Sequence, residues 1–185
     1  MSIRTKRALK ISLKKMLRKK SIFKITIRDI TDDCGVNRMT FYYHFQDIYE
    51  LIEWTWRDDV GIAFQGMDTY DMWWQGYSKV FQSLLEDKEV IKNLYKEDYL
   101  ENIKQSMYAF TYNLMIELVE ERAADMEIPM EDKKFIAEFY KYAFVGIVLD
   151  WIRDGMKKDP EQIIKRLNIL MEGNVKKAVK AYKVE

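Results

Sequence analysis

The stretch from Thr26 to Phe45 restricts the fold of this chain more than any other, because it contains two helix starts and one helix stop close together. Thr26 is a good N-cap, and Asp29 three residues later can complete a capping box with it. Gly35 ends that helix, since glycine enters the left-handed conformation without steric cost. Asn37 is a second N-cap. The spacing predicts two short helices joined by a tight turn, a helix-turn-helix.

The second predicted helix has an apolar side and a polar side. Phe41 and Phe45 lie four residues apart and can both point back to the first helix. The opposite surface then carries Arg38, Thr40, Tyr42, Tyr43 and His44. A DNA major groove requires side chains of this kind near a helix N-terminus. A structural hairpin with a solvated polar face has the same spacing, so the pattern alone leaves both interpretations open.

The residues at these positions resemble the DNA-binding domain of the TetR/AcrR family of bacterial regulators. The family pattern reads Thr-apolar-x-x-Ile-Ala-x-x-Ala-Gly-Val-Ser-x-Gly-Thr-apolar-Tyr-x-His/Tyr-Phe, and residues 26–45 match it at most of its defining positions. Some positions depart from it. Thr31 and Cys34 replace alanines of the pattern. Met39 replaces a frequent glycine, and Ile48 stands where the family usually has a lysine at the start of its fourth helix.

The resemblance implies roles for individual side chains. Five of them would face bases: Arg28, Asn37, Arg38, Thr40 and Tyr43. Three would hold phosphates: Thr26, Tyr42 and His44. The resemblance also implies a dimer formed by the last two helices and an inducer site in the domain that follows the fourth helix.

The composition indicates an all-α fold. Seven glycines and two prolines among 185 residues leave few turn positions for a sheet. We expect about nine helices in two domains, a three-helix DNA-binding domain at 1–47 and a helical effector-binding and dimerisation domain at 48–185. The helices outside the motif are predicted at Ile3–Lys20, Gln46–Val60, Thr69–Leu85, Lys88–Lys96, Tyr99–Glu121, Glu131–Arg153 and Pro160–Ala181.

Charge is distributed unevenly along the chain. Residues 1–47 contain 12 Lys/Arg and 4 Asp/Glu, a net charge of +8, whereas the remainder contains 19 and 26, a net charge of −7. A basic end alone is compatible with nucleic acid, acidic lipid or simple solubility. Together with a helix-turn-helix it favours a DNA duplex, and we expect the N-terminal basic residues of the first helix to approach a phosphate strand.

Aromatic residues are concentrated in the second predicted domain. They recur at helical spacing on three predicted helices and include Trp73, Tyr77, Tyr108, Tyr112 and Phe139. Rings with polar tips suit a pocket for a flat or amphipathic small molecule, so these residues are the candidate effector pocket. Ordinary core packing is the alternative.

The last predicted helices have wide apolar faces. In the final one, Ile163, Leu167, Leu170 and Met171 recur at helical spacing. By resemblance these residues lie in a dimer interface, and burial within one subunit is the alternative. Residues 144–167 also resemble, more weakly, a TetR branch of dihydroxyacetone kinase operon regulators, in which a protein coactivator can be involved.

Several classes of protein do not suit this sequence. Cys34 is the single cysteine, which excludes an intramolecular disulfide and fits a reducing compartment, and we interpret it as a small core residue. No segment approaches the roughly 18 apolar residues of a membrane span. The one histidine, His44, lies in the predicted DNA surface, and no P-loop or paired cysteines occur. We therefore expect a cytoplasmic protein that is not an enzyme and has no metal or cofactor.

These patterns predict a sequence-specific transcriptional regulator that binds a palindromic operator as a homodimer and is a repressor relieved by a ligand. Two alternatives stay open. One is an activator or corepressor-type regulator controlled by a protein partner, and the other is a helical interaction adaptor. The expected partners are double-stranded DNA, a second copy of the chain, and a small-molecule effector or a protein coregulator, but no membrane.

Overall fold

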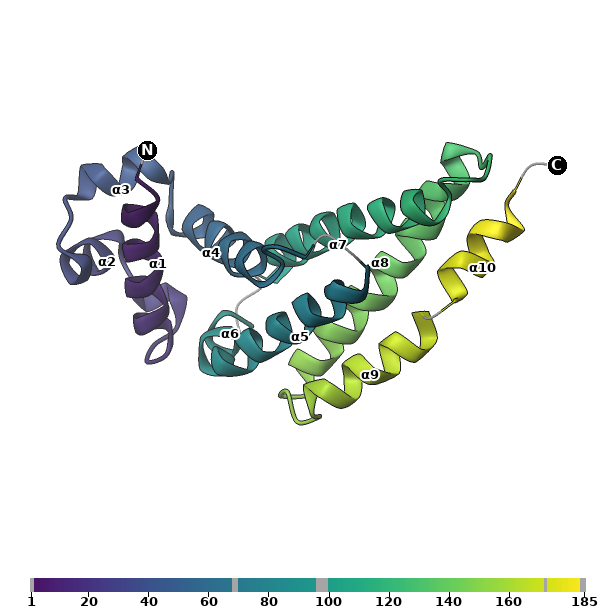
Figure 1. Ribbon diagram of the computed structural model, residues 1–185. Coiled ribbons are helices and arrows are strands. Elements are labelled where there is room, and N and C mark those ends of the chain that lie inside the picture. Colours follow the sequence, from purple (N-terminus) through teal and green to yellow (C-terminus); the bar gives the residue numbers. More distant parts are fainter. Residues whose placement is uncertain (1, 68–69, 96–99, 172, 184–185) are drawn as a thin grey trace. The chain divides into compact units, whose positions relative to one another are not determined.

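The computed structural model describes residues 2–67, 70–95, 100–171 and 173–183, and every regular element in these ranges is a helix. The elements are α1 (Ile3–Leu17), η1 (Ile22–Lys24), α2 (Ile27–Cys34), α3 (Arg38–His44), α4 (Ile48–Ala63), α5 (Tyr70–Glu86), α6 (Lys88–Tyr95), α7 (Leu100–Arg122), α8 (Met130–Arg153), α9 (Pro160–Met171) and α10 (Asn174–Ala181) (Figure 1). The predicted all-α class is confirmed. Three predicted helix ends, Thr69, Lys96 and Tyr99, lie outside the described residues.

The chain forms two compact units. Unit 1 consists of residues 1–65 and 79–103, and unit 2 consists of residues 66–78 and 104–185. Because α5 and α7 each contribute residues to both units, the chain passes between the units within these two helices. The predicted boundary between residues 47 and 48 separates DNA binding from effector binding and dimerisation, and it stays a prediction.

The helix-turn-helix has the predicted caps. The Asp29 amide donates to Thr26 Oγ1 at 3.1 Å, and the Thr26 amide donates to Asp29 Oδ2 at 2.9 Å, which completes the capping box of α2. Gly35 ends α2 at a φ of 68°, in the left-handed region that favours glycine. Asn37 Oδ1 accepts from the Met39 amide at 2.8 Å and starts α3. Both short helices are therefore bounded by local hydrogen bonds.

A small core holds these helices against α1 in unit 1. Leu9, Leu13, Ile30 and Phe41 are among its fully buried side chains. The buried hydroxyl of Ser12 in α1 donates to the Ile30 carbonyl at 3.1 Å, so this polar group has a hydrogen-bond partner inside the core. The packing of α1 on α2 and of α2 on α3 leaves the far side of α3 uncovered within this group (Figure 1).

The predicted final helix, Pro160–Ala181, is wrong as a single element. The chain leaves α9 at Met171 and begins α10 at Asn174, and Gly173 between them has a φ of 75°. A positive φ cannot continue a right-handed helix, and an isolated glycine in an apolar pattern gives little warning of such a break. Beyond this break α10 contacts α8 and the end of α9, with Val175 and Val179 buried (Figure 1).

Helices α7 and α8 both contribute to the core of unit 2. Met115, Leu118 and Val119 of α7 and Phe144 and Val145 of α8 are almost fully buried. In the described part of the chain, none of the helices is long and apolar enough to cross a membrane. The same residues contain no group of three or more side chains placed to hold a metal ion.

Candidate DNA-binding surface

Helix α3 exposes Arg38 and Tyr43, which are predicted to contact bases, and Tyr42, which is predicted to hold a phosphate. Phe41 is fully buried and anchors the helix, which turns Arg38, Tyr42 and Tyr43 to the exposed side. Thr40 is half-buried. The exposed side of α3 thus combines a cation, two phenols and a hydroxyl, which can all donate hydrogen bonds to bases or phosphates.

Arg38 already has a partner on the same surface. Its Nη2 donates to the Tyr42 hydroxyl at 3.0 Å, and its guanidinium carbon lies 5.5 Å from the centre of the Tyr42 ring. A stacked guanidinium has fewer accessible rotamers, so less freedom is lost when it makes a bidentate contact with guanine. Tyr42 therefore orients Arg38 as well as presenting its own hydroxyl.

Thr26 and Asn37 use one side-chain atom as a helix cap and keep another available. Thr26 Oγ1 accepts from Asp29, but its hydroxyl hydrogen can still be donated. Asn37 accepts through Oδ1, which leaves its amide hydrogens for an outside acceptor. Arg28 is exposed and forms only a 3.4 Å surface pair with Asp32, a kind of pair that contributes little to stability. All three residues are exposed.

His44 is only half-buried, but its Nδ1 atom is buried without a hydrogen-bond partner among the described residues. Burial, with a smaller effect of the Lys6 charge, lowers the pKa of His44 below its usual value of 6.5. The ring is therefore neutral at pH 7 and carries one N–H. Placing that hydrogen on Nε2 leaves no buried donor without an acceptor, and it makes Nε2 the atom able to donate to a phosphate.

Met39, which replaces a frequent glycine of the family pattern, is exposed on α3. Its side chain is 72% exposed, next to Arg38 on the first turn of α3. An exposed apolar side chain at this position can contact a thymine methyl group. The signal available in the sequence was its place between two predicted base-contacting residues, Arg38 and Thr40.

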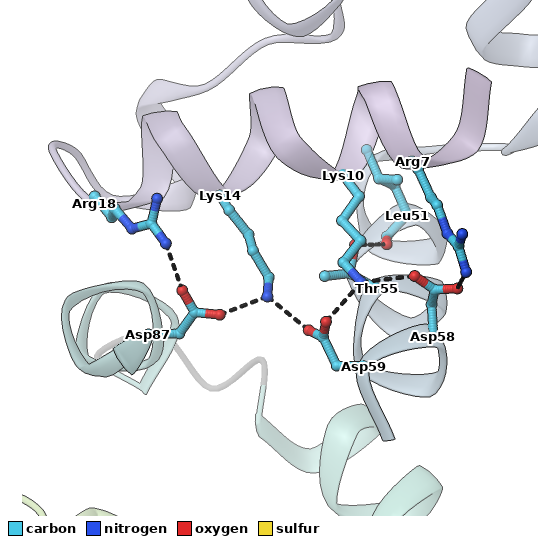
Figure 2. Close-up of polar contacts among 9 residues, drawn as sticks. All are labelled: Arg7, Lys10, Lys14, Arg18, Leu51, Thr55, Asp58, Asp59 and Asp87. Atoms are coloured by element: carbon cyan, nitrogen blue, oxygen red, sulfur yellow. Dashed lines mark hydrogen bonds and ion pairs between the residues drawn. The ribbon is translucent and has the colours of Figure 1, made fainter. Parts of the chain in front are cut away.

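Most cations on one face of α1 form ion pairs within unit 1. Arg7, Lys10, Lys14 and Arg18 form one row along α1 and face Asp58 and Asp59 of α4 and Asp87 of the α5–α6 turn (Figure 2). We call these seven residues the α1 ion-pair network. Its pairs are Arg7–Asp58 (3.4 Å), Lys10–Asp58 (2.7 Å), Lys10–Asp59 (2.6 Å), Lys14–Asp59 (2.7 Å), Lys14–Asp87 (2.5 Å) and Arg18–Asp87 (2.8 Å).

The network is partly buried, and its pKa shifts show net attraction. The side chains of Lys10 and Lys14 are 10% and 16% exposed. Burial lowers the pKa of Lys14, but its bonds to Asp59 and Asp87 outweigh that effect and raise the pKa above 10.5. Burial by itself raises the pKa of Asp58. The opposite effect of Lys10 and Arg7 is larger, so the pKa of Asp58 lies below its usual value of 3.8. Much of the positive charge of residues 1–47 is therefore neutralised inside unit 1.

Lys6 lies near the C-terminal end of α3. Its Nζ is 5.1 Å from the ring centre of Phe45 and 5.5 Å from that of Trp54. It forms no ion pair within the described parts of the chain. Lys6 is thus a cation of α1 that remains available to a phosphate beside His44.

The predicted effector-pocket residues differ in their burial. Trp73 and Tyr77 are buried, and the Tyr77 ring stacks on Phe144 at 4.9 Å. Tyr108 and Tyr112 are half-buried. Phe139 contradicts the expectation of an interior ring, because its side chain is 64% exposed. The buried residues of α8 occupy the other side of that helix, and Phe139 belongs to an exposed stripe with Phe135 and Tyr142.

A groove of about 600 Å³ lies elsewhere, between the C-terminal end of α8 and α9. Its apolar lining includes Trp151, Ile163, Leu167 and Leu170, and Lys158 and Arg166 lie at its polar part. The Trp151 indole donates to the Lys158 carbonyl at 2.8 Å. None of the five predicted pocket residues lines this groove.

The predicted dimer residues of α9 fall on two sides of that helix. Leu167 and Met171 are 5% and 3% exposed, so they belong to the core of their own subunit. Ile163 is half-buried. Leu170 is 64% exposed, as is its neighbour Ile169 at 62%. The periodicity alone could not show which side of α9 is buried, because that depends on which other helices pack against it.

Comparison with known proteins identifies the family. Residues 71–173 match a TetR family model described as the transcriptional regulator C-terminal region. The chain is 22% identical, over 90% of both chains, to the HTH-type dhaKLM operon transcriptional activator of Lactococcus lactis subsp. lactis (strain IL1403). This relative is a transcriptional regulator.

Solved structures share the fold. The dihydroxyacetone kinase operon activator DhaS superposes with a TM-score of 0.75 at 19% identity, over 99% of this chain and 100% of that one. AlkX, a TetR family repressor from Dietzia sp., has a TM-score of 0.59 at 15% identity, over 94% and 96% of the two chains. NalD, a repressor from Pseudomonas aeruginosa, has a TM-score of 0.54 at 20% identity, over 91% and 94%. Because the family model covers more than half of the sequence, this chain belongs to the TetR family of transcriptional regulators.

Proposed function

We propose that this regulator binds a palindromic operator as a homodimer, with α3 of each subunit in a major groove. The observation that carries the proposal is the two-sided character of α3, whose buried Phe41 leaves Arg38, Tyr42 and Tyr43 exposed. Two such helices about 34 to 36 Å apart address successive major grooves.

Specific roles follow from donor type and accessibility. Arg28, Asn37, Arg38, Thr40 and Tyr43 contact bases in this proposal. Thr26, Tyr42 and His44 hold phosphates through hydroxyl and Nε2 donors. Met39 adds an apolar contact to a thymine methyl group, which the family pattern does not predict.

The dimer interface is proposed on the exposed apolar residues of the last helices. Phe135 and Phe139 supply such a stripe on α8, and Ile169 and Leu170 supply one on α9. Leu170→Glu should give monomers in analytical sedimentation. Leu167→Glu is not an equivalent test, because it places a charge in the core and unfolds the subunit. An unchanged dimer mass for Leu170→Glu removes α9 from the interface.

The α1 ion-pair network offers a route by which a signal reaches the DNA-binding helices. Asp87 precedes α6 and bridges Lys14 and Arg18 of α1, and Asn93 of α6 donates to the Leu17 carbonyl at 2.7 Å. Since α5 belongs to both units, a change in unit 2 has a continuous helix leading to Asp87. A small-molecule effector or a protein coregulator acts by binding one of two arrangements more tightly than the other.

The direction of regulation has two candidates. A repressor relieved by its effector is the first. A transcriptional activator is the second, and the specific observation in its favour is that the Lactococcus lactis relative, matched over 90% of the chain, is an activator. Expression of a reporter downstream of the operator, compared with and without this protein, distinguishes them by sign.

Selection of bound sites from a random duplex pool tests DNA binding and yields the operator. The selected sites should be palindromic, and the affinity should fall steeply with salt, with a log–log slope near −0.9 per phosphate contact. A helical adaptor would enrich no sequence. Recovery of no site at low ionic strength, with and without cell extract, contradicts the proposal.

A further inference from the structure

Three tyrosines of unit 2 surround the ammonium group of Lys141. Lys141 Nζ lies 4.3 Å from the ring centre of Tyr142, 5.5 Å from that of Tyr112 and 5.8 Å from that of Tyr108. Tyr108 and Tyr112 come from α7, whereas Lys141 and Tyr142 come from α8. We call the three rings the tyrosine cage. A positive charge within about 6 Å of a ring centre is attracted by the negative face of the ring.

The rings are the principal partners of this lysine. Its side chain is 12% exposed, and among the described residues its ammonium has a single carboxylate partner, Glu138 Oε1 at 3.5 Å. That carboxylate side chain is 51% exposed, so water screens the pair. An ammonium has three N–H donors and binds water strongly, whereas ring faces offer it no hydrogen-bond acceptor of carboxylate or carbonyl strength.

An organic cation without N–H groups suits the same space better. A quaternary ammonium has no donors to satisfy, and aromatic cages bind such groups through the ring faces. Displacement of Lys141 by such a cation would return its ammonium to water on a flexible four-carbon side chain. The exchange replaces one positive charge beside the rings by another, and Lys104 Nζ, 5.9 Å from the centre of the Tyr108 ring, need not move.

We propose that the tyrosine cage is a binding site for a small organic cation of the quaternary ammonium class, and that Lys141 is its internal occupant. The cage includes two residues of the candidate effector pocket, Tyr108 and Tyr112, and adds Tyr142. The site gives a chemical class to the effector in the proposed function. The regulatory consequence rests on that function, but cation binding does not, because it can be measured without DNA.

The first test uses the full chain and choline as the probe. Lys141→Met removes the internal cation and keeps a side chain of similar length. Choline should bind this variant in calorimetric titration about tenfold more tightly than the wild type, since the rings hold the neutral methionine side chain less strongly than a cation. The uncharged analogue, with a tert-butyl group in place of the trimethylammonium group, should not bind either protein.

Two matched variants locate the site. Lys134→Met, which changes an exposed lysine of the same helix, should leave choline affinity at the wild-type value. Adding Tyr112→Leu to Lys141→Met should reduce the gained affinity about tenfold. Equal binding of choline and its uncharged analogue, or no saturable binding of choline to Lys141→Met, overturns the proposal.

A second measurement on the wild type does not depend on the folding of any variant. Choline that displaces Lys141 should increase modification of its amine by an acylating reagent, followed by peptide mass spectrometry. Lys134 is the internal control, and its labelling should not change. Labelling of Lys141 that is the same with choline, with the uncharged analogue and with buffer means that the lysine stays in place and that the proposal is wrong.

Discussion

The two units bury lysine side chains to a similar extent but in different surroundings. Lys10 and Lys14 in unit 1 are 10% and 16% exposed and face carboxylates, whereas Lys141 in unit 2 is 12% exposed and faces aromatic rings. Carboxylates neutralise a cation, and their attraction depends on pH and salt. Rings attract a cation without neutralising it, so they accept another cation equally well. The first arrangement suits a fixed connection and the second suits an exchangeable occupant.

The largest expected effect is on the α1 ion-pair network. Lys14→Met leaves the Asp59 and Asp87 carboxylates without their shared cation in a partly buried position. The free energy of unfolding should fall by about 2 to 3 kcal/mol in urea titration. Lys15→Met is the control, because Lys15 is 59% exposed and pairs with Asp33 alone. Equal losses for the two variants would show that burial of the network has no energetic importance.

The second effect is on operator affinity, and it compares a cation proposed to contact DNA with a cation paired inside the protein. Arg38→Ala should weaken binding to the selected operator by about 1 to 3 kcal/mol and relax specificity at one base pair. Arg7→Ala, which removes a cation paired with Asp58, should change operator affinity much less. Fluorescence anisotropy on operator and unrelated duplexes measures both. An equal loss for Arg38→Ala on every sequence reassigns it to a phosphate contact.

A third, smaller effect concerns salt. Lys141→Met should lower the free energy of unfolding by about 1 kcal/mol, since a partly exposed cation–π contact is weak. Raising salt to about 1 M, where the Debye length is about 3 Å, should reduce the difference between wild type and Lys14→Met. The difference between wild type and Lys141→Met should change less, because the rings carry no net charge. Urea titrations at the two salt concentrations measure both differences. A larger salt effect for Lys141→Met than for Lys14→Met contradicts the proposed difference between carboxylate and ring surroundings.

The smallest effect is on the response to acid. The pKa of Asp58 is depressed in the folded chain, so the unfolded chain binds more protons below pH 3.8. The stabilisation by Asp58 is therefore present above that pH and is lost as the pH falls through the folded pKa. Stability of the wild type, measured by urea titration at several pH values, should decline more steeply below pH 3.8 than that of Asp58→Asn. Parallel curves would mean that Asp58 has the same pKa in both states.

The local features of the helix-turn-helix could be predicted because their causes lie within a few residues. The capping box of Thr26 and Asp29, the left-handed Gly35 and the Asn37 cap each depend on neighbours in the sequence. The inward direction of Phe41 follows from helical spacing in the same way. Such features need no knowledge of the rest of the fold.

The partners of charged and apolar side chains depended on contacts between distant segments. Lys14 lies 73 residues from Asp87, and no spacing rule connects them. Leu167 and Phe139 both have apolar patterns, but the fold buries the first and exposes the second. The helices, their caps and the exposed side of α3 could thus be predicted from the sequence alone. The assembled fold selected which charges are neutralised and which apolar faces remain exposed, because those outcomes depend on which helices pack together.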